Sequence, residues 1–281
     1  MKFNVPGATI HYEFSTGSNT LNDTMPALFI LPGGPGFDCE NYKKYTELLG
    51  DRYQIVYHDP RGCGQSTLDD ITTCTIETSI RDLEALRQHL KLPKINVLGK
   101  SYGSMVATGY ATQYSQYIDR LVLVTGAPSH HFFPEACSIL EERGTPRQKE
   151  VCDWVFRGDV RTDERAREFL RATRSLYAVT VQYDEQAILK PAIHFSPKIC
   201  DFGFPRLVAE DGFDFIEDLK LIQNETLVVS GQHDWINPPS QQKIMVDNIP
   251  KARLLTLDAG HALEVDRPEE YRAALRDFLL G

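Results

Sequence analysis

The 281-residue sequence predicts an α/β fold in which a mostly parallel sheet carries helices on both faces. Two observations predict it. Short apolar runs alternate with helical patterns over residues 1–127 and again over 214–281. Between them, residues 128–213 contain helical and proline-rich segments without a strong strand signal. We therefore expect a core domain built from the two outer segments and a helical cap inserted at 128–213.

The expected strands are short and rich in β-branched residues. ATIHYEF (8–14) alternates at period two, whereas ALFIL (27–31) and YQIVYH (53–58) are continuous apolar runs, as in strands covered on both faces. Four later runs complete the predicted sheet: INVLG (95–99), RLVLVTG (120–126), NETLVVSG (224–231) and ARLLTLDA (252–259).

Helices are expected between these strands. Residues 77–91 place Ile80, Leu83, Leu86 and Leu90 at helical spacing, with charged residues on the opposite side. A second helix is expected over 102–115. A closing helix over 268–280 begins with Pro268 and two glutamates, a strong helix-start signal.

Charge and composition exclude several functional classes. The net charge is −9, from 30 Lys and Arg against 39 Asp and Glu, which disfavours a nucleic-acid or anionic-membrane partner. No apolar run approaches the roughly 18 residues of a membrane helix, and the first residues resemble a strand more than a secretory signal. The six cysteines show no C-x-x-C spacing, so we expect no metal site and a cytoplasmic location.

The segment INVLGKSYGSMVATGYA carries the main chemical signal. A buried strand runs into G-x-S-x-G, with Gly99, Ser101 and Gly103, and then into a helix. This is the pattern of a nucleophile elbow, a sharp turn that exposes the serine hydroxyl. Lys100 and Ser101 also imitate the end of a phosphate-binding loop, but that motif needs a glycine where this chain has Lys94, so nucleotide binding is rejected.

A serine nucleophile needs a histidine base and an acid that orients it. Of the eight histidines, only His233 and His261 follow the later strands, and His261 lies in the loop before the last helix. We predict His261 as the base. Asp234 is preferred to Glu264 or Asp258 as the acid, because it follows a separate strand and can approach the imidazole from behind.

Backbone amides are expected to hold the negative charge that develops on the substrate oxygen. The amide after the nucleophile belongs to Tyr102. The second donor is expected in the glycine-rich loop LPGGPG (31–36), where Gly34 is the better candidate because Pro35 has no N–H group.

Five segments together resemble the α/β-hydrolase superfamily and, within it, the prolyl aminopeptidases, or proline iminopeptidases: LPGGPG, YHDPRGCGQS (57–66), GKSYGS (99–104), GQHDW (231–235) and GHALEVDRPEE (260–270). The similarity covers 1–127 and 224–281. It implies Ser101, Asp234 and His261 as the catalytic triad and Gly34 and Tyr102 as oxyanion donors. It also implies structural roles for Asp59 and Arg61.

The chain departs from that family at two places. Pro32 stands where the family has a histidine in the oxyanion loop, and Trp235 stands where the family has an acid that binds the substrate amino group. The family has a second such acid in its cap, and Asp201 and Glu210 of the predicted cap are the candidates for it here, with Trp235 lining the same pocket. Aromatic residues are expected to form the apolar wall of that pocket: Phe132, Phe133, Trp154, Phe156, Tyr177 and Tyr183.

The resulting expectation is a serine hydrolase of the prolyl aminopeptidase type, which releases an N-terminal residue from a small peptide and uses no cofactor or metal. The first alternative is a carboxylesterase or lactonase with the same triad, favoured by Trp235. The second is a binding protein of the hydrolase fold, against which the complete Ser, Asp and His set argues. Ser101, in place of an aspartate, excludes epoxide hydrolases and haloalkane dehalogenases.

Overall fold

The computed structural model describes residues 1–17, 20–22, 24–181 and 194–281 and contains one mixed sheet in the order β1-β2-β4-β3-β5-β6-β7-β8. The first two strands are antiparallel, and all pairs from β4 to β8 are parallel. The predicted fold class is confirmed. The strands are β1 (Lys2–Val5), β2 (Ala8–Phe14), β3 (Ala27–Leu31), β4 (Gln54–His58), β5 (Ile95–Lys100), β6 (Ile118–Val124), β7 (Glu225–Gly231) and β8 (Ala252–Leu257).

Ten α-helices lie in the described part of the chain. Four short 3₁₀ helices are also present there, at Glu47–Leu49, Ile71–Thr73, Ser115–Tyr117 and Ile216–Leu221. None of the described helices is long and apolar enough to cross a membrane. The α-helices are α1 (Glu40–Thr46), α2 (Ile76–His89), α3 (Tyr102–Tyr114), α4 (Phe132–Arg143), α5 (Pro146–Arg157), α6 (Asp163–Tyr177), α7 (Pro197–Leu207), α8 (Pro239–Asn248), α9 (Leu263–Asp266) and α10 (Pro268–Leu280).

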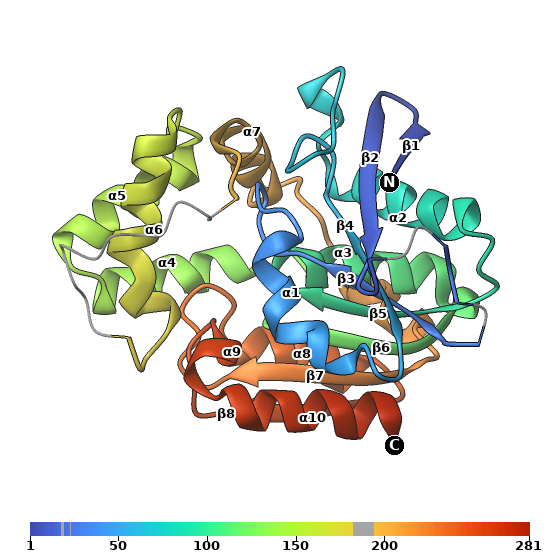
Figure 1. Cartoon of the computed structure of the whole chain (residues 1–281). Coiled ribbons are helices and arrows are strands. Elements are labelled where there is room, and N and C mark those ends of the chain that lie inside the picture. The colour runs from blue at the N-terminus through green and yellow to red at the C-terminus, as the bar shows by residue number, and fades with distance from the viewer. Residues whose placement is uncertain (18–19, 23, 182–193) are drawn as a thin grey trace.

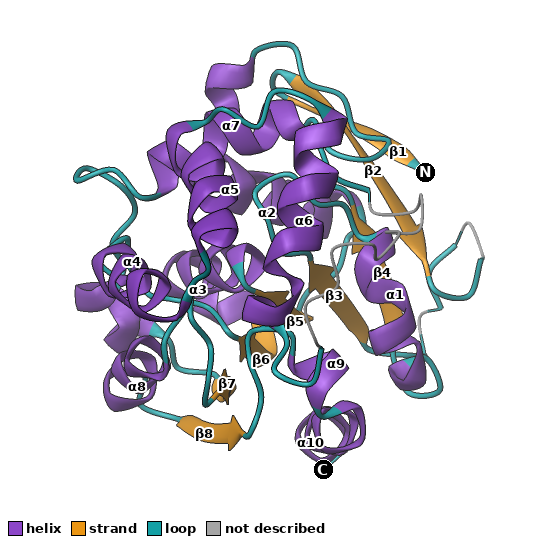
Figure 2. Cartoon of the chain, turned by 90° about the vertical axis from the view of Figure 1, so that its left-hand side faces the viewer, coloured by secondary structure: helices purple, strands orange, loops and turns teal. Residues whose placement is uncertain are grey.

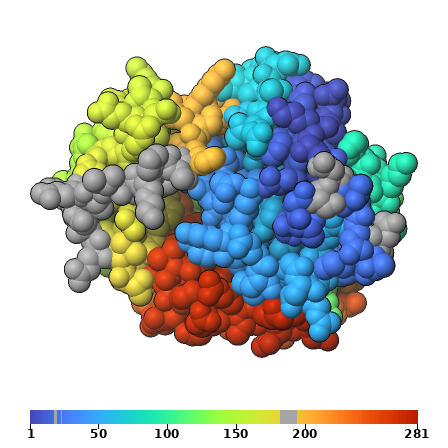
Figure 3. All heavy atoms as spheres, viewed as in Figure 1, coloured from blue at the N-terminus to red at the C-terminus, as the bar shows by residue number. Residues whose placement is uncertain are grey.

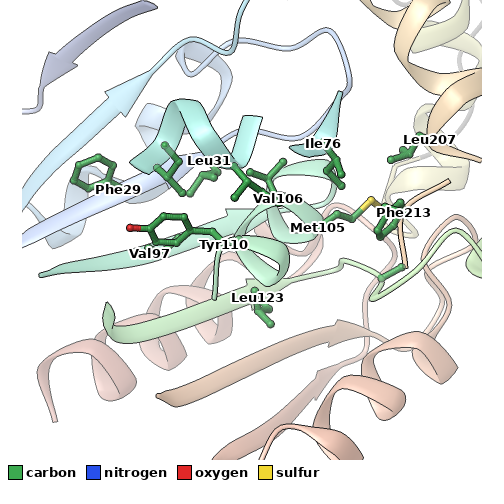
Figure 4. Close-up of a cluster of buried hydrophobic side chains, with 14 of the residues drawn as sticks. Phe29, Leu31, Ile76, Val97, Met105, Val106, Tyr110, Leu123, Leu207 and Phe213 are labelled. Atoms are coloured by element: carbon green, nitrogen blue, oxygen red, sulfur yellow. The ribbon is translucent and has the colours of Figure 1, made fainter. Parts of the chain in front are cut away.

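Helices cover both faces of the sheet (Figure 2), and two apolar clusters fill the interfaces. Successive strand residues point to opposite faces, so Phe29 joins the cluster with α2 and α3, whereas Leu28 joins the cluster with α10. Figure 4 shows the first cluster, in which Met105, Val106 and Tyr110 of α3 pack near strand residues. The central strands are therefore continuous apolar runs because both faces are buried.

Helices α4 to α7 lie within residues 128–213, which we call the cap segment. They lie on the side of the molecule toward which the arrowheads of β5 and β7 point (Figure 1), so they face the carboxyl ends of the parallel strands. Thr145 and Gln148 form a capping box that begins α5, and Thr162 caps α6. The division into core and cap remains a prediction.

The sequence did not predict α1 and α8. Helix α8 has the sequence PSQQKIMVDN, whose apolar residues form a single run instead of recurring at helical spacing. Only Met245 among these apolar residues is fully buried. Such a helix is stabilised mainly by its tertiary packing, so its sequence carries little periodic signal.

Candidate active site

Ser101 occupies a strained turn between β5 and α3. Its backbone angles are φ 55° and ψ −118°, a conformation that side-chain-bearing residues rarely adopt. Its amide donates to the carbonyl of Val124 at 2.8 Å, which holds the turn against β6. The turn needs glycine on both sides, because a Cβ at Gly99 would lie 2.3 Å from the carbonyl oxygen of Gly103. The local sequence therefore forms the elbow geometry that its pattern predicts.

Asp234 and His261 are hydrogen-bonded to each other. The His261 Nδ1 atom lies 2.8 Å from Asp234 Oδ2, and both residues are buried. An ionised carboxylate only accepts hydrogen bonds, so Nδ1–H donates and Nε2 is left as the basic nitrogen. The other Asp234 oxygen accepts from the amides of Ile236 and Asn237, each at 3.0 Å. The aspartate is thus fixed on one side and orients the imidazole on the other.

Ser101 and His261 both follow strands of the parallel region, at the same edge of the sheet. Their side chains are not hydrogen-bonded to each other in this structure. A link between their backbones does exist, because the ammonium group of Lys100 donates to the carbonyl oxygen of His261. Asp234 is therefore hydrogen-bonded to His261 directly, whereas Ser101 is linked to His261 through its chain neighbour Lys100.

The loop after β3 borders the elbow. A Cβ at Gly33 would lie 3.4 Å from Cβ of Ser101, and a Cβ at Gly103 would lie 2.2 Å from the carbonyl oxygen of Leu31. Gly34 has φ +143°, which strongly favours glycine. Neither its amide nor that of Tyr102 donates a hydrogen bond to any described group. The amide of Tyr102 directly follows Ser101, and that of Gly34 lies in the loop that borders the elbow.

The three candidate pocket residues have different surroundings. Asp201 accepts from the amides of Val160 and Arg161, both at 2.7 Å, so each carboxylate oxygen already holds a turn of the cap segment. Glu210 is exposed in the turn after α7. Trp235 is only 2% exposed, and its Nε1 atom has no hydrogen-bond partner among the described residues.

Of the aromatic residues proposed for the pocket wall, Tyr177 contacts the base. Its ring lies edge-on to the rings of His261 and Trp235, with centroid distances of 5.3 and 5.6 Å, respectively. Phe133 and Phe156 pack against each other within the cap segment, with ring centroids 4.9 Å apart. Tyr183 lies outside the described residues. Burial raises the pKa of Tyr177 well above its ordinary value, so this ring is an uncharged wall next to the imidazole.

Asp266 received no role from the sequence, yet it joins the cap segment to the loop of His261. Its carboxylate accepts from the amides of Gly260 at 2.8 Å, Val179 at 3.0 Å and Thr180 at 2.8 Å. Burial by itself would raise the pKa of this carboxyl, but the hydrogen bonds from Thr180, Gly260 and Val179 outweigh burial and lower it. Its partners in the cap segment, Val179 and Thr180, lie 87 and 86 residues away in the chain, so no local pattern reveals them.

A second contact joins the cap segment to the glycine-rich loop. The amide of Ser196 donates to the carbonyl of Gly36 at 2.8 Å, and the Phe37 and Phe195 rings lie 4.9 Å apart. His194 Nδ1 is 2.9 Å from the buried carboxylate of Asp38. The cap segment therefore touches the loop that carries Gly34 as well as the loop that carries His261.

Asp59 and Arg61 belong to the supporting structure. Asp59 accepts hydrogen bonds from His11 Nδ1 at 3.0 Å and from the amide of Gln65 at 2.9 Å. Arg61 forms a buried bidentate pair with Asp82, at 2.8 and 2.7 Å. Both side chains are used within the protein, which agrees with the structural roles that the family resemblance implies.

No group of three or more His, Cys, Asp or Glu side chains among the described residues could hold a metal ion. All six cysteines are free thiols. Four of them, Cys39, Cys63, Cys152 and Cys200, are buried. Burial raises the pKa of Cys152 to about 12, which makes this thiol a poor nucleophile.

Comparison with known proteins adds to this geometry. A family model described as the alpha/beta hydrolase fold matches residues 26–268. A proline iminopeptidase, PfmaB of Pestalotiopsis fici, is 29% identical over 92% of this chain and 92% of its own length. The proline iminopeptidase of Lactobacillus helveticus is 27% identical over 90% of each chain.

Solved structures show the same fold. A crystal structure of proline iminopeptidase from Mycobacterium smegmatis has a TM-score of 0.71 at 20% identity and covers 97% of this chain and 94% of that one. An esterase from Exiguobacterium antarcticum has a TM-score of 0.72 at 20% identity and covers 99% of this chain and 97% of the other. The structural likeness extends across proteins named for peptide and for ester substrates.

Proposed function

Because the chain belongs to the α/β-hydrolase family and is a hydrolase that resembles the proline iminopeptidases, we propose that Ser101, His261 and Asp234 act as its catalytic triad. The single observation that carries this proposal is the buried Asp234–His261 hydrogen bond at the strand edge that also presents Ser101. A strained, half-buried serine and an oriented imidazole at the same edge of the sheet are the components of an activated nucleophile.

In the proposed reaction, Ser101 Oγ attacks the substrate carbonyl carbon while Nε2 of His261 takes the hydroxyl proton. Asp234 holds the imidazole in the required tautomer and stabilises its positive charge. His261 then returns the proton to the leaving group, which departs as the amine or alcohol. A water molecule hydrolyses the acyl-enzyme by the same steps and restores Ser101.

The amides of Gly34 and Tyr102 are proposed to bind the oxyanion. Both donors lack partners among the described groups. Tyr102 directly follows Ser101, and Gly34 belongs to the loop whose Gly33 borders Ser101. Preorganised amides stabilise the developing charge without reorganising, and the loss of one such donor costs about 2.7–4 kcal/mol of barrier in comparable enzymes. The glycine-rich loop therefore contributes through its backbone, which explains why its side chains are minimal.

For the substrate, we propose a small peptide from which an N-terminal residue, proline, is released. The names of the relatives at 27–29% identity support this. Such a substrate carries a charged amino group that needs an anionic partner in the pocket. Asp201 is already engaged by two amides, which leaves Glu210 as the other acid considered.

The second candidate is an esterase or lactonase activity on small neutral esters. It is favoured by the surroundings of Trp235, which is buried next to Tyr177 and presents no charge. An uncharged wall beside the base suits an acyl group without an amino group, because burying an unpaired ammonium is costly.

A paired assay distinguishes the two substrates. Hydrolysis of proline 2-naphthylamide and of p-nitrophenyl acetate is measured for the wild type, Ser101→Ala and Glu210→Gln. The aminopeptidase proposal expects a higher kcat/KM for the amide, and Glu210→Gln should raise KM for the amide alone. Turnover of the ester only would favour the esterase. Wild-type turnover of either substrate by Ser101→Ala would overturn the triad itself.

A further inference from the structure

Lys100 is a buried lysine directly before the proposed nucleophile. It is the last residue of β5, and its side chain is only 4% exposed. Its ammonium donates to the backbone carbonyl of His261, 161 residues later in the chain, and lies 3.3 Å from Glu264 Oε2. The proposed reaction gives the Lys100 ammonium no role. From the sequence, the only function considered for Lys100 is nucleotide binding, which is rejected.

A buried ion pair at this position needs a physical reason. Removing an ammonium and a carboxylate from water costs several kcal/mol for each ion, and an apolar pair of similar volume is often as stable or more stable. The Glu264 side chain is 11% exposed, and its Oε2 atom has no hydrogen-bond partner among the described residues. Stability alone therefore does not account for the pair. Its lysine, however, supplies a directed donor to the carbonyl of His261.

The location of that donor is informative. Asp234 fixes the ring of His261 at Nδ1, but a side-chain contact does not fix the backbone that carries the ring. Lys100 is covalently joined to Ser101 and is hydrogen-bonded to His261, so it is a direct tether between the backbones of the two residues. Displacements of about 1 Å between reacting groups can cost roughly 100-fold in rate.

We propose that Lys100 is a positioning residue that sets the distance between Ser101 and His261, with Glu264 as the counterion that makes its burial possible. This proposal rests on the proposed triad. Lys100 does not touch the substrate. It acts by holding the carbonyl of His261, so that Nε2 meets the serine hydroxyl when the substrate is bound.

The first test is Lys100→Met, which keeps an unbranched apolar side chain of nearly the same length but removes the donor. With p-nitrophenyl acetate, we expect kcat to fall about 10- to 100-fold and KM to change little, since the pocket walls are intact. The thermal midpoint should also fall, because Glu264 is left buried without its counterion.

The double variant Lys100→Met/Glu264→Met separates positioning from stability. Removing both charges should return the thermal midpoint toward the wild-type value, whereas kcat should stay low because His261 still lacks its donor. This variant also keeps the test available if Lys100→Met alone does not fold. Recovery of kcat together with the midpoint would show that the pair only stabilises the fold and would overturn the proposal.

Arg87→Met is the matched control. Arg87 forms another buried pair, with Glu84 at 2.6 Å, on α2 and outside the proposed site. It should lower the thermal midpoint without changing kcat of the folded enzyme. Ser101→Ala is measured in parallel. If Ser101→Ala is inactive but Lys100→Met keeps wild-type kcat, the positioning role fails and the triad stands. If Ser101→Ala is active, the triad itself is wrong.

Discussion

The ring of Tyr177, the last residue of α6, lies edge-on to the imidazole of His261, with centroids 5.3 Å apart and planes at 85°. The backbone repeats this contact, because the amide of Ala262 donates to the carbonyl of Tyr177 at 2.7 Å. In Figure 3 the yellow residues at the end of α6 lie beside the red residues around α9. The cap segment is thus packed against the loop of the proposed base as well as lying over the strand ends.

The proposed triad predicts a non-additive pair of substitutions. Ser101→Ala and His261→Ala should each lower kcat by several orders of magnitude, and the double variant should be little worse, because the groups act as a unit. Steady-state kinetics with either assay substrate, together with circular dichroism to confirm folding, measures this. Should either single variant keep more than about a tenth of wild-type turnover, corresponding to a barrier change under about 1.4 kcal/mol, the assignment is wrong.

Gly103→Ala should prevent correct assembly of the elbow. A Cβ there would lie 2.2 Å from the carbonyl oxygen of Leu31 and 2.6 Å from that of Pro32, both rigid backbone atoms. We expect a loss of about 3 kcal/mol or more in the free energy of unfolding, measured by urea denaturation. Gly17→Ala is the control, because no atom of the described residues outside its chain neighbours lies within 4 Å of its Cβ position, and its φ of +67° opposes the change. Equal stability of both variants would contradict the prediction.

Asp266→Asn should weaken the attachment of the cap segment to the loop of His261. Hydrogen bonds to a charged acceptor contribute about 1.5–3 kcal/mol each, so we expect the unfolding free energy to drop by about 2–3 kcal/mol at pH 7. The pKa of Asp266 is lowered in the folded protein, so its contribution is present above its unfolded pKa of about 3.9 and is lost as pH falls through the folded value.

The difference between wild type and Asp266→Asn should therefore shrink as denaturation is repeated at pH values below about 4. Asp258→Asn is the matched control in the same region, since Asp258 is exposed and pairs with Arg267 and His233 at the surface. It should change stability little. If the unfolding free energies of wild type and Asp266→Asn differed by the same amount at every pH, the charge of Asp266 would not be the cause of the difference.

His58, the last residue of β4, should make the protein sensitive to mild acid. Burial lowers its pKa to about 4, with a smaller opposing effect from Asp59, and its Nδ1 atom has no partner among the described groups. Between about pH 6.5 and 4 the unfolded chain binds a proton that the folded chain does not. The stability of the protein is therefore unaffected by His58 above about pH 6.5. It decreases as the pH falls from there toward about 4, the pKa of His58 in the folded protein.

His58→Phe should reduce that acid-induced loss by about 3 kcal/mol, from 1.36 kcal/mol per pKa unit. Unfolding free energies at pH 7 and pH 4 measure the effect. A cavity of about 20 Å³ next to His58 leaves room for small adjustments of the ring. If the unfolding free energy fell equally between pH 7 and pH 4 in the wild type and in His58→Phe, His58 would not take up a proton on unfolding.

Much of the fold could be predicted because its signals are local. The runs at 27–31 and 8–14 coincide with β3 and β2, and the elbow at Ser101 is encoded in the five residues Gly99–Gly103. The turn at Ser101 needs glycine two residues away on each side, because a Cβ at Gly99 or Gly103 would clash with backbone atoms. Elements whose stability comes from packing, such as α8, gave no comparable signal.

The sequence by itself thus determined the strand and helix pattern, the elbow and the short set of acids and histidines from which a triad could be chosen. Only the tertiary structure decided how those residues are used. It brings Asp234 to His261, occupies Asp201 with two amides, and joins Lys100 and Asp266 to the loop of His261. The physical reason is that a hydrogen bond depends on positions in space, and the strand order brings together segments more than a hundred residues apart.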